Sequence, residues 1–190
     1  MKSFFQVFPK VFTPAECKAI VTYGQRVIPR NGAVVMAGKN AIAMQQRRCQ
    51  VRWLSAADEA LSIVCKRIRL KMLEANIGMG VDVGMGDFHS LQLTEYSSSS
   101  EGWHQMHEDC AWINPTSAWD RKLTAVLQLT PPSKYRGGAL SFERTSLPAD
   151  AFRQAGDLIV FPSWLRHQVS PVTKGTRHSL VAWMYGPPWR

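Results

Sequence analysis

Residues 156–172 read GDLIVFPSWLRHQVSPV. Two short runs within this stretch, 157–162 and 167–172, are separated by a turn that contains Ser163. Runs of this length, bounded by Gly, Pro and Ser, are typical of strands and are shorter than most helices. The stretch therefore predicts two consecutive strands, with the imidazole of His167 at the start of the second.

The chain after Gly86 repeats this pattern. Leu91 and Leu93 alternate with polar neighbours, and a Gly137-Gly138 pair predicts a turn before another short apolar run. Many short strands broken by turn residues are typical of a β-sandwich or barrel. We expect strands at 91–96, 123–129, 140–142, 157–162, 167–172 and 179–185.

The N-terminal part has helical signals instead. Thr13 and Glu16 form a capping box around Pro14, which suits the first helical position. A second cap at 55–58 precedes apolar residues at helical spacing and predicts a helix that runs to about Glu74. Residues 30–46 are expected to form a loop. The predicted fold class is mainly β with N-terminal helices, in a single domain over 1–190 whose helical support region is 1–87.

Composition places the chain among globular proteins. Its 190 residues are 45% hydrophobic and 19% charged, which fits one domain of ordinary size. No apolar run approaches the roughly 20 residues of a transmembrane helix, and Pro9 and Lys10 interrupt the N-terminus too early for a signal peptide. The four cysteines are scattered, which disfavours a cysteine zinc site and predicts free thiols. We expect a soluble, cytoplasmic protein with no membrane partner.

The formal charge of +9 is unevenly distributed. Residues 1–75 contain 13 Lys and Arg against 4 Asp and Glu, whereas residues 76–190 contain 10 of each. A uniformly basic nucleic-acid-binding chain does not have this distribution. The excess comes largely from the run at 66–71 and from Arg47, Arg48 and Arg52. A solvated face is the default interpretation. The alternative is that the three arginines hold an acidic polypeptide substrate near the site.

A candidate metal site lies in the electrically balanced part. His107 and Asp109 are two residues apart, so on a strand their side chains point to the same side. His167 follows later in the chain. Two His and one carboxylate on one face of a metal leave coordination positions open, as Fe(II) enzymes that bind a co-substrate and O₂ require. His104 has the opposite strand parity and is expected at the pocket edge or on the surface.

Arg177 lies ten residues after His167. A buried guanidinium that faces a metal cavity needs an anion, and its fork pairs with a carboxylate through two hydrogen bonds. The spacing therefore suggests an organic acid that bridges the metal and Arg177.

Four segments carry a family resemblance: EGWHQMHED, YRGGALSFE, GDLIVFPSWLRHQVSPV and KGTRHSLVAW. Together they resemble the Fe(II)/2-oxoglutarate-dependent dioxygenases, most closely the prolyl 4-hydroxylase-like branch. The resemblance implies a double-stranded β-helix (jelly-roll) catalytic core over 88–186. It also implies Fe(II), 2-oxoglutarate and O₂ as cofactor and co-substrates, and it allows for ascorbate.

The resemblance further implies roles for individual residues. The expected Fe(II) ligands are His107, Asp109 and His167, and Arg177 is expected to pair with the C5 carboxylate of 2-oxoglutarate. Those four are the expected catalytic residues. Co-substrate or cavity contacts are expected from Tyr96, Ser179, Val169, Trp183 and Gln128. Some prolyl hydroxylases have a Tyr, which assists the C5 carboxylate, at the position of Gln128. Gln128 could still donate one hydrogen bond there.

The implied reaction is hydroxylation of a prolyl or other residue in a peptide or protein, with decarboxylation of 2-oxoglutarate to succinate. A free amino acid is a further substrate class. One alternative is nucleic-acid dealkylation, which the charge favours. Oxygenases of that type typically carry a second Arg six residues after the first, where this chain has Trp183. Another alternative is a non-catalytic β-helix module that binds a metal or ligand.

Overall fold

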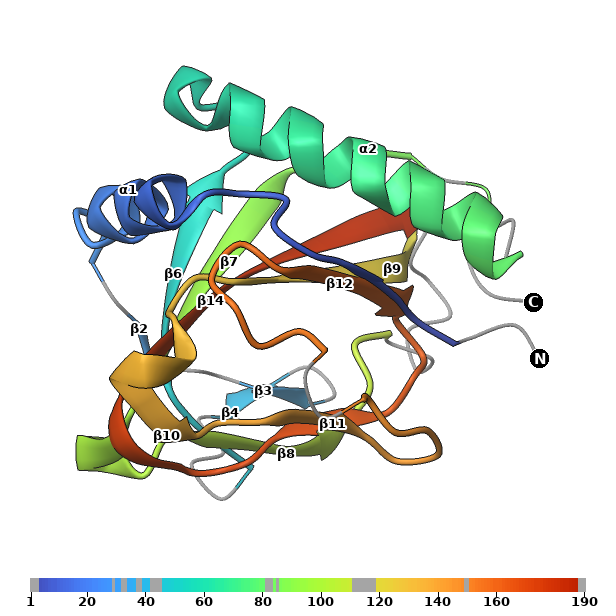
Figure 1. Ribbon diagram of the computed structural model, residues 1–190. Helices are drawn as coiled ribbons and strands as arrows, with labels where there is room; N and C mark the ends of the chain where they lie inside the picture. The colour runs from blue at the N-terminus through green and yellow to red at the C-terminus, as the bar shows by residue number, and fades with distance from the viewer. Residues whose placement is uncertain are drawn as a thin grey trace.

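The computed structural model describes residues 4–28, 30–31, 34–36, 39–41, 46–80, 84, 86–110, 119–148 and 151–187. Two helices cover one side of a pair of facing β-sheets (Figure 1). The helices are α1 (Pro14–Gly24) and α2 (Ser62–Met79). No helix in this part of the chain is both long and apolar enough to cross a bilayer.

The strands follow in chain order. They are β1 (Gln6–Phe8), β2 (Arg30–Asn31), β3 (Val34–Met36), β4 (Lys39–Ala41), β5 (Arg47–Arg48), β6 (Gln50–Ser55), β7 (Ser90–Ser97), β8 (Trp103–His107), β9 (Asp120–Gln128), β10 (Tyr135–Gly137), β11 (Leu140–Phe142), β12 (Leu158–Pro162), β13 (His167–Val169) and β14 (Val172–Gly186).

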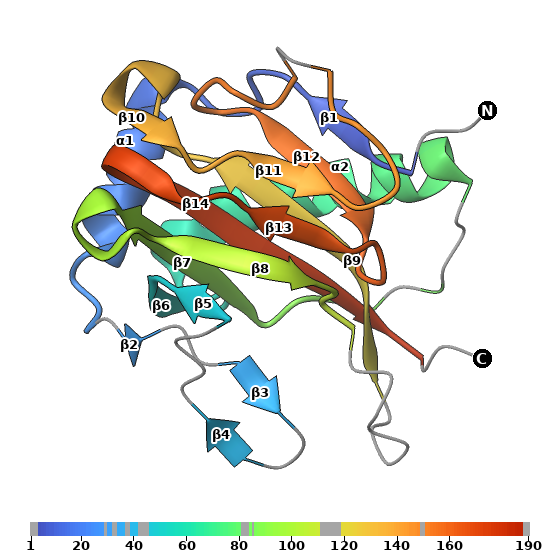
Figure 2. The ribbon, with the colours of Figure 1, turned by 90° about the horizontal axis from the view of Figure 1, so that it is seen from below.

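The two sheets are antiparallel and form the jelly-roll core. The larger sheet has the order β1-β12-β9-β14-β7-β6-β2, and β10 pairs with β14. The smaller sheet has the order β11-β13-β8-β5 and lies across the inner face of the larger one (Figure 2). The remaining two strands, β3 and β4, form a separate hairpin. This arrangement confirms the predicted fold class, mainly β with N-terminal helices.

Side chains alternate along the strands of the larger sheet, so that one face contributes to the hydrophobic core and the other lines a pocket. Leu180, Ala182 and Met184 of β14 belong to the core under the helices, together with Ile68 and Met72 of α2. The residues between them on β14 face the smaller sheet, where they line a pocket. Since side chains of a strand alternate between its two faces, one strand both anchors the helices and builds the pocket wall.

Capping residues explain where the helices begin and end. The predicted box at α1 is present: the Glu16 N–H donates to Thr13 Oγ1 at 3.2 Å, and the Thr13 N–H donates to Glu16 Oε2 at 2.7 Å. Helix α2 follows a 3₁₀ turn capped by Asp58 and continues to Met79. The predicted end near Glu74 is wrong, because the helix is closed by Gly80, whose φ of 64° lies in the left-handed region.

Several predicted strands and strand boundaries also need correction. The segment expected to be a loop, 30–46, contains β2, β3 and β4 where the structure describes it. Strands β6 and β8 were not predicted, because their patterns are interrupted by charged and polar residues. Strand β14 begins at Val172 rather than Ser179 and runs to Gly186.

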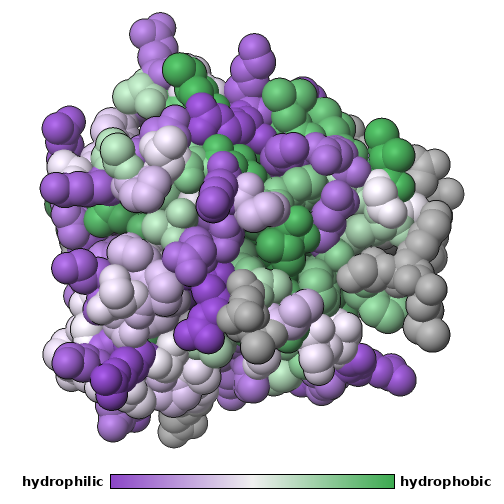
Figure 3. Space-filling model, in the orientation of Figure 1, coloured by the Kyte–Doolittle hydropathy of each residue, from purple (hydrophilic) through white to green (hydrophobic). Residues whose placement is uncertain are grey.

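The basic run on α2 is a solvated surface. Arg67 pairs with Glu16 and Lys71 with Glu74 at the helix surface. Figure 3 shows hydrophilic side chains interspersed with hydrophobic ones over the region of this helix. Three large apolar side chains of α2 are exposed there: Ile63, Leu70 and Ile77.

Candidate metal centre

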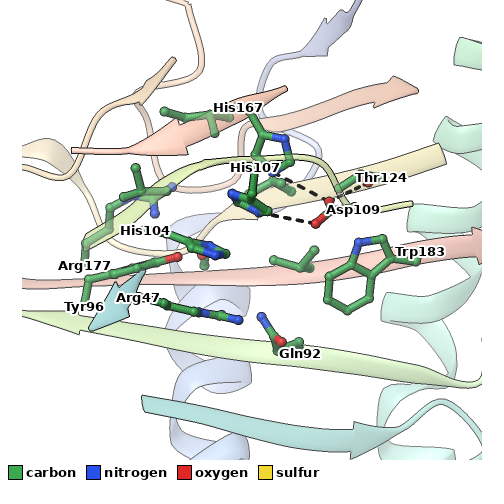
Figure 4. A pocket seen from close by; sticks show the side chains of 15 residues that line it. Arg47, Gln92, Tyr96, His104, His107, Asp109, Thr124, His167, Arg177 and Trp183 are labelled. Carbon is green, nitrogen blue, oxygen red and sulfur yellow. Dashed lines mark hydrogen bonds and ion pairs between the residues drawn. The ribbon is translucent and has the colours of Figure 1, made fainter. Parts of the chain in front are cut away.

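Three candidate ligands converge where β8 and β13 pair. His107 is the last residue of β8, and His167 is the first of β13 and lies directly opposite it. Asp109 follows the end of β8, where its N–H donates to the Ser163 carbonyl at 2.8 Å. One ligand atom from each of the three residues lies within 4.8 Å of the other two (Figure 4). The register of the smaller sheet therefore joins residues that are far apart in sequence.

Hydrogen bonds fix which ring nitrogens face the centre. His107 Nδ1 lies 2.8 Å from the Gln105 carbonyl, and His167 Nδ1 lies 2.9 Å from the Leu165 carbonyl. A carbonyl oxygen only accepts, so in its neutral form each ring carries its proton on Nδ1 and has a lone pair on Nε2.

Those lone pairs make the centre suitable for a cation. The Nε2 atoms of His107 and His167 lie 3.4 and 3.6 Å from the two oxygens of Asp109. When both rings are neutral in this tautomer, no proton lies between these atoms, and they repel one another unless a positive ion lies among them. Two imidazoles and a carboxylate, with both rings oriented by backbone carbonyls, match the donor set of a divalent transition metal.

The charge state at neutral pH fits the same role. Burial would raise the pKa of Asp109, but the neighbouring His167 and His107 outweigh it and hold that pKa well below its usual range. Thr124 Oγ1 also donates to Asp109 Oδ2 at 2.8 Å. Burial lowers the pKa of His167 to about 4, against the opposing effect of Asp109. The carboxylate is therefore ionised and the His167 ring neutral, which are the forms that bind metals.

Arg177 lies on the opposite side of the same pocket (Figure 4). Its side chain on β14 is almost fully buried, and its guanidinium lies 5.6 Å from the centre of the Tyr96 ring. In the part of the chain that the structure describes, no carboxylate lies within 4.0 Å of this guanidinium. A buried cation without an acidic partner is unfavourable, so the site requires an anionic ligand.

Four further predicted residues line this pocket: Tyr96, Val169, Ser179 and Trp183. Burial raises the pKa of Tyr96 to about 12, which keeps its hydroxyl protonated as a hydrogen-bond donor. The Trp183 indole Nε1 is buried and finds no hydrogen-bond partner among the residues the structure describes. Both groups therefore offer donors to a ligand.

Gln128 makes different hydrogen bonds from the one expected. Its Nε2 donates to the Thr130 carbonyl at 2.9 Å and to the Tyr135 hydroxyl at 2.8 Å, so both amide hydrogens are used. Its Oε1 accepts from Arg177 Nε at 3.1 Å. This corrects the expected direct hydrogen bond to the co-substrate: Gln128 orients Arg177 instead.

His104 enters the pocket because of a β-bulge. On β13, His167 and Val169 are two residues apart, whereas their partners on β8, His107 and His104, are three apart. The extra residue reverses the strand parity, so the parity argument is wrong. The His104 ring stacks on the His107 ring with centroids 3.6 Å apart.

Arg47 lies in the pocket, although a solvated face was the default prediction for it. It lies on β5 opposite His104, is 8% exposed, and lines the pocket together with Gln92. Arg52 is also buried, against Glu95 at 3.0 Å. The solvated-face interpretation is wrong for both arginines. The available signal was the alternation of Arg47 with Cys49 and Val51, which places it on the same face as two apolar residues.

Comparison with known proteins assigns the family. Residues 91–185, half of the chain, match the sequence profile of the 2OG-Fe(II) oxygenase superfamily. The chain belongs to this superfamily. Oxygenases of this superfamily use Fe(II), 2-oxoglutarate (2OG) and O₂. The two imidazoles and one carboxylate of this oxygenase, with Arg177 across the pocket, fit those groups.

The sequence relatives of this oxygenase are hydroxylases by name. A PKHD-type hydroxylase of Rippkaea orientalis is 30% identical over 112 residues, which cover 59% of this chain and 50% of the relative. A PKHD-type hydroxylase of Synechococcus elongatus is 36% identical over 98 residues, covering 50% of this chain and 43% of the relative. The chain thus spans about half the length of these relatives.

Solved structures share the fold of the oxygenase. A Pseudomonas putida prolyl-4-hydroxylase has a TM-score of 0.69 at 20% identity and covers 95% of this chain and 91% of its own. A Trichoplax adhaerens prolyl hydroxylase, in complex with a hypoxia inducible factor peptide fragment, has a TM-score of 0.72 at 17% identity, covering 96% and 83%. At these identities the likeness establishes the jelly-roll fold alone.

Proposed function

We propose that this oxygenase hydroxylates a prolyl or other residue in a peptide or protein and converts 2OG to succinate and CO₂. One observation carries the proposal. Ligand atoms of His107, Asp109 and His167 lie within 4.8 Å of one another, in the same pocket as a buried Arg177 that has no acidic partner in the described residues. Hydroxylase-named relatives and prolyl hydroxylase structural neighbours support the reaction class.

In this proposal each residue has a physical task. Bound Fe(II) and 2OG supply the oxidising chemistry that places one oxygen atom of O₂ in a substrate C–H bond. His107, Asp109 and His167 hold the ion from one side. Arg177 pairs with the C5 carboxylate of 2OG through its terminal nitrogens, because Gln128 already accepts from its Nε.

The remaining pocket residues position the ligands and exclude water. Ser179 and Tyr96 add hydroxyl donors beside Arg177, and Val169 supplies an apolar wall. Trp183 offers toward the cavity a flat ring and an indole N–H that has no partner among the described residues. A dry, preorganised pocket strengthens each of these polar contacts.

A peptide substrate is proposed by analogy with the neighbours. The Trichoplax adhaerens enzyme was solved with a peptide fragment bound. Nucleic-acid dealkylation gains no support, since Arg48, Arg52 and Arg67 each pair with a glutamate and form no free basic stripe. The second Arg that is typical of dealkylating oxygenases, six residues after the first, is also absent here, because that position is the pocket residue Trp183.

The test is Fe(II)-dependent formation of succinate from 2OG, with mass spectrometry of a peptide and amino-acid panel for a gain of one oxygen. His107→Ala should abolish both signals. Arg48→Gln, at an exposed residue outside the pocket, should leave them unchanged. Metal-dependent binding of 2OG without turnover of any substrate would favour a non-catalytic module, and absence of 2OG binding would reject the proposal.

A further inference from the structure

We propose that Arg47 forms a second carboxylate-binding subsite, and that the substrate carries a carboxylate close to the carbon that is oxidised. The inference rests on the proposed function and adds the chemical class of its substrate. It concerns a guanidinium that reaches the pocket from the smaller sheet, whereas Arg177 comes from the larger one.

Arg47 is placed close to the metal centre by strand pairing. It lies opposite His104 across β5 and β8, and the His104 ring stacks on the ligand His107 at 3.6 Å. In Figure 4 the Arg47 side chain extends toward Gln92, in a direction different from that of Arg177. The pocket therefore offers two cationic positions, of which the proposed function uses one for 2OG.

The hydrogen-bonding capacity of Arg47 is largely unused. Its Nε donates to Cys49 Sγ at 2.8 Å, which holds the side chain and leaves the two terminal nitrogens. The neighbouring Arg48 pairs with Glu101, and Arg52 pairs with Glu95. Within the described ranges no carboxylate lies within 4.0 Å of Arg47. A buried, unpaired guanidinium is unfavourable, and an anionic ligand removes that penalty.

The charge balance of the pocket also favours a substrate that carries a carboxylate. Among its lining residues, Arg47 and Arg177 are permanently positive and Asp109 is the one carboxylate. Bound Fe(II) and the 2OG dianion cancel each other. The loaded pocket therefore retains one positive charge, and a substrate carboxylate neutralises it. In a poorly solvated site this complementarity discriminates strongly between an acid and its neutral amide.

Two kinds of substrate supply such a group. One is the α-carboxylate of a free amino acid or of a C-terminal residue, and the other is an acidic side chain beside the oxidised residue. Both place the same planar anion on the Arg47 fork. The experiment includes both.

The test compares matched acids and amides on protein loaded with Mn(II) and 2OG without oxygen. The probes are N-acetyl-L-proline and N-acetyl-L-prolinamide, the same pair for other amino acids, and capped peptides with Glu or Gln beside proline. Binding is measured by isothermal titration calorimetry. We expect acids to bind at least about tenfold more tightly than amides, in line with a charge-assisted hydrogen-bonded pair.

Variants assign that preference to one side chain. Arg47→Gln should abolish it and leave the 2OG dissociation constant within about twofold, and Arg47→Lys should restore part of it because the charge returns without the fork. Arg48→Gln is the control and should bind like the wild type. Circular dichroism and 2OG binding report whether each variant is folded.

Three results would overturn the inference. The first is equal binding of acids and amides, or no binding of any acid. The second is a preference for acids that survives in Arg47→Gln. The third is loss of 2OG affinity in Arg47→Gln, which assigns Arg47 to the co-substrate. In each case normal 2OG turnover would leave the proposed function intact, whereas absent metal-dependent 2OG binding in the wild type would reject both.

Discussion

The Nε–H of Arg177 donates to Oε1 of Gln128 at 3.1 Å, and both side chains are almost fully buried. The Gln128 amide is itself held by the Thr130 carbonyl and the Tyr135 hydroxyl. These partners determine the orientation of the amide, since the Thr130 carbonyl at the Nε2 end only accepts and the Arg177 Nε–H at the Oε1 end only donates. Gln128 is therefore a positioning residue that directs the remaining donors of Arg177 into the pocket.

Replacing Gln128 should weaken 2OG binding without removing the guanidinium. In Gln128→Leu the Arg177 Nε loses its buried acceptor, and we expect the 2OG dissociation constant to rise about tenfold, equivalent to about 1.4 kcal/mol. Calorimetry on Mn(II)-loaded protein measures it. Gln50→Leu, at an exposed position of β6, is the matched control. Unchanged affinity in Gln128→Leu would show that Arg177 needs no support.

Gly138 should be sensitive to a single methyl group. Its φ is +61°, and a Cβ there would lie 3.0 Å from Arg177 Cδ and 2.9 Å from Val172 Cγ2. Gly138→Ala should displace Arg177 and reduce 2OG affinity by about tenfold, besides reducing stability by about 1 kcal/mol through backbone strain. In Gly78→Ala the added Cβ meets only the flexible end of Gln6, so 2OG affinity should persist. A Gly138→Ala protein with full affinity would contradict this packing argument.

Divalent metal should stabilise the folded protein through three ligands. At a free Mn(II) concentration 100 times the dissociation constant, the gain is about 2.7 kcal/mol and appears as a higher melting temperature. His107→Gln should lose this gain. His104→Gln should keep most of it, because His104 does not belong to the group whose ligand atoms converge. Equal losses in the two variants would make His104 a ligand.

The metal-free protein should lose stability as the pH falls from about 7 to about 5. Burial lowers the pKa values of His104, His167 and His178 below the ordinary 6.5, and that of His167 reaches about 4. The unfolded chain then binds protons in a window where the folded chain does not, so acid favours unfolding. This stabilisation is complete at pH values above the histidine pKa of the unfolded chain. It is lost as the pH falls toward the lower pKa of the folded protein.

Urea denaturation at pH 7.5, 6.5 and 5.5 checks this dependence. His178→Gln should flatten it, because burial lowers the pKa of that imidazole in the folded protein relative to the unfolded chain. His89→Gln, at an exposed position, should leave the slope unchanged. A free energy of unfolding independent of pH across this interval would contradict the prediction.

The sequence alone determined the local features of this protein. The capping box at Thr13 and the strands around Leu91 and Leu180 follow from spacing and alternation. These signals depend on residues close in the chain, where strand or helix geometry settles which side chains share a face.

Only the tertiary structure decided the rest of the pocket. Arg47 enters it because β5 pairs with β8, His104 because a bulge opposite β13 reverses its parity, and Gln128 supports Arg177 because β9 lies beside β14. Register and bulges arise from hydrogen bonds between distant strands, which no local pattern encodes. For the same reason the charge of Arg47 resembled surface charge in the sequence and became a pocket charge in the fold.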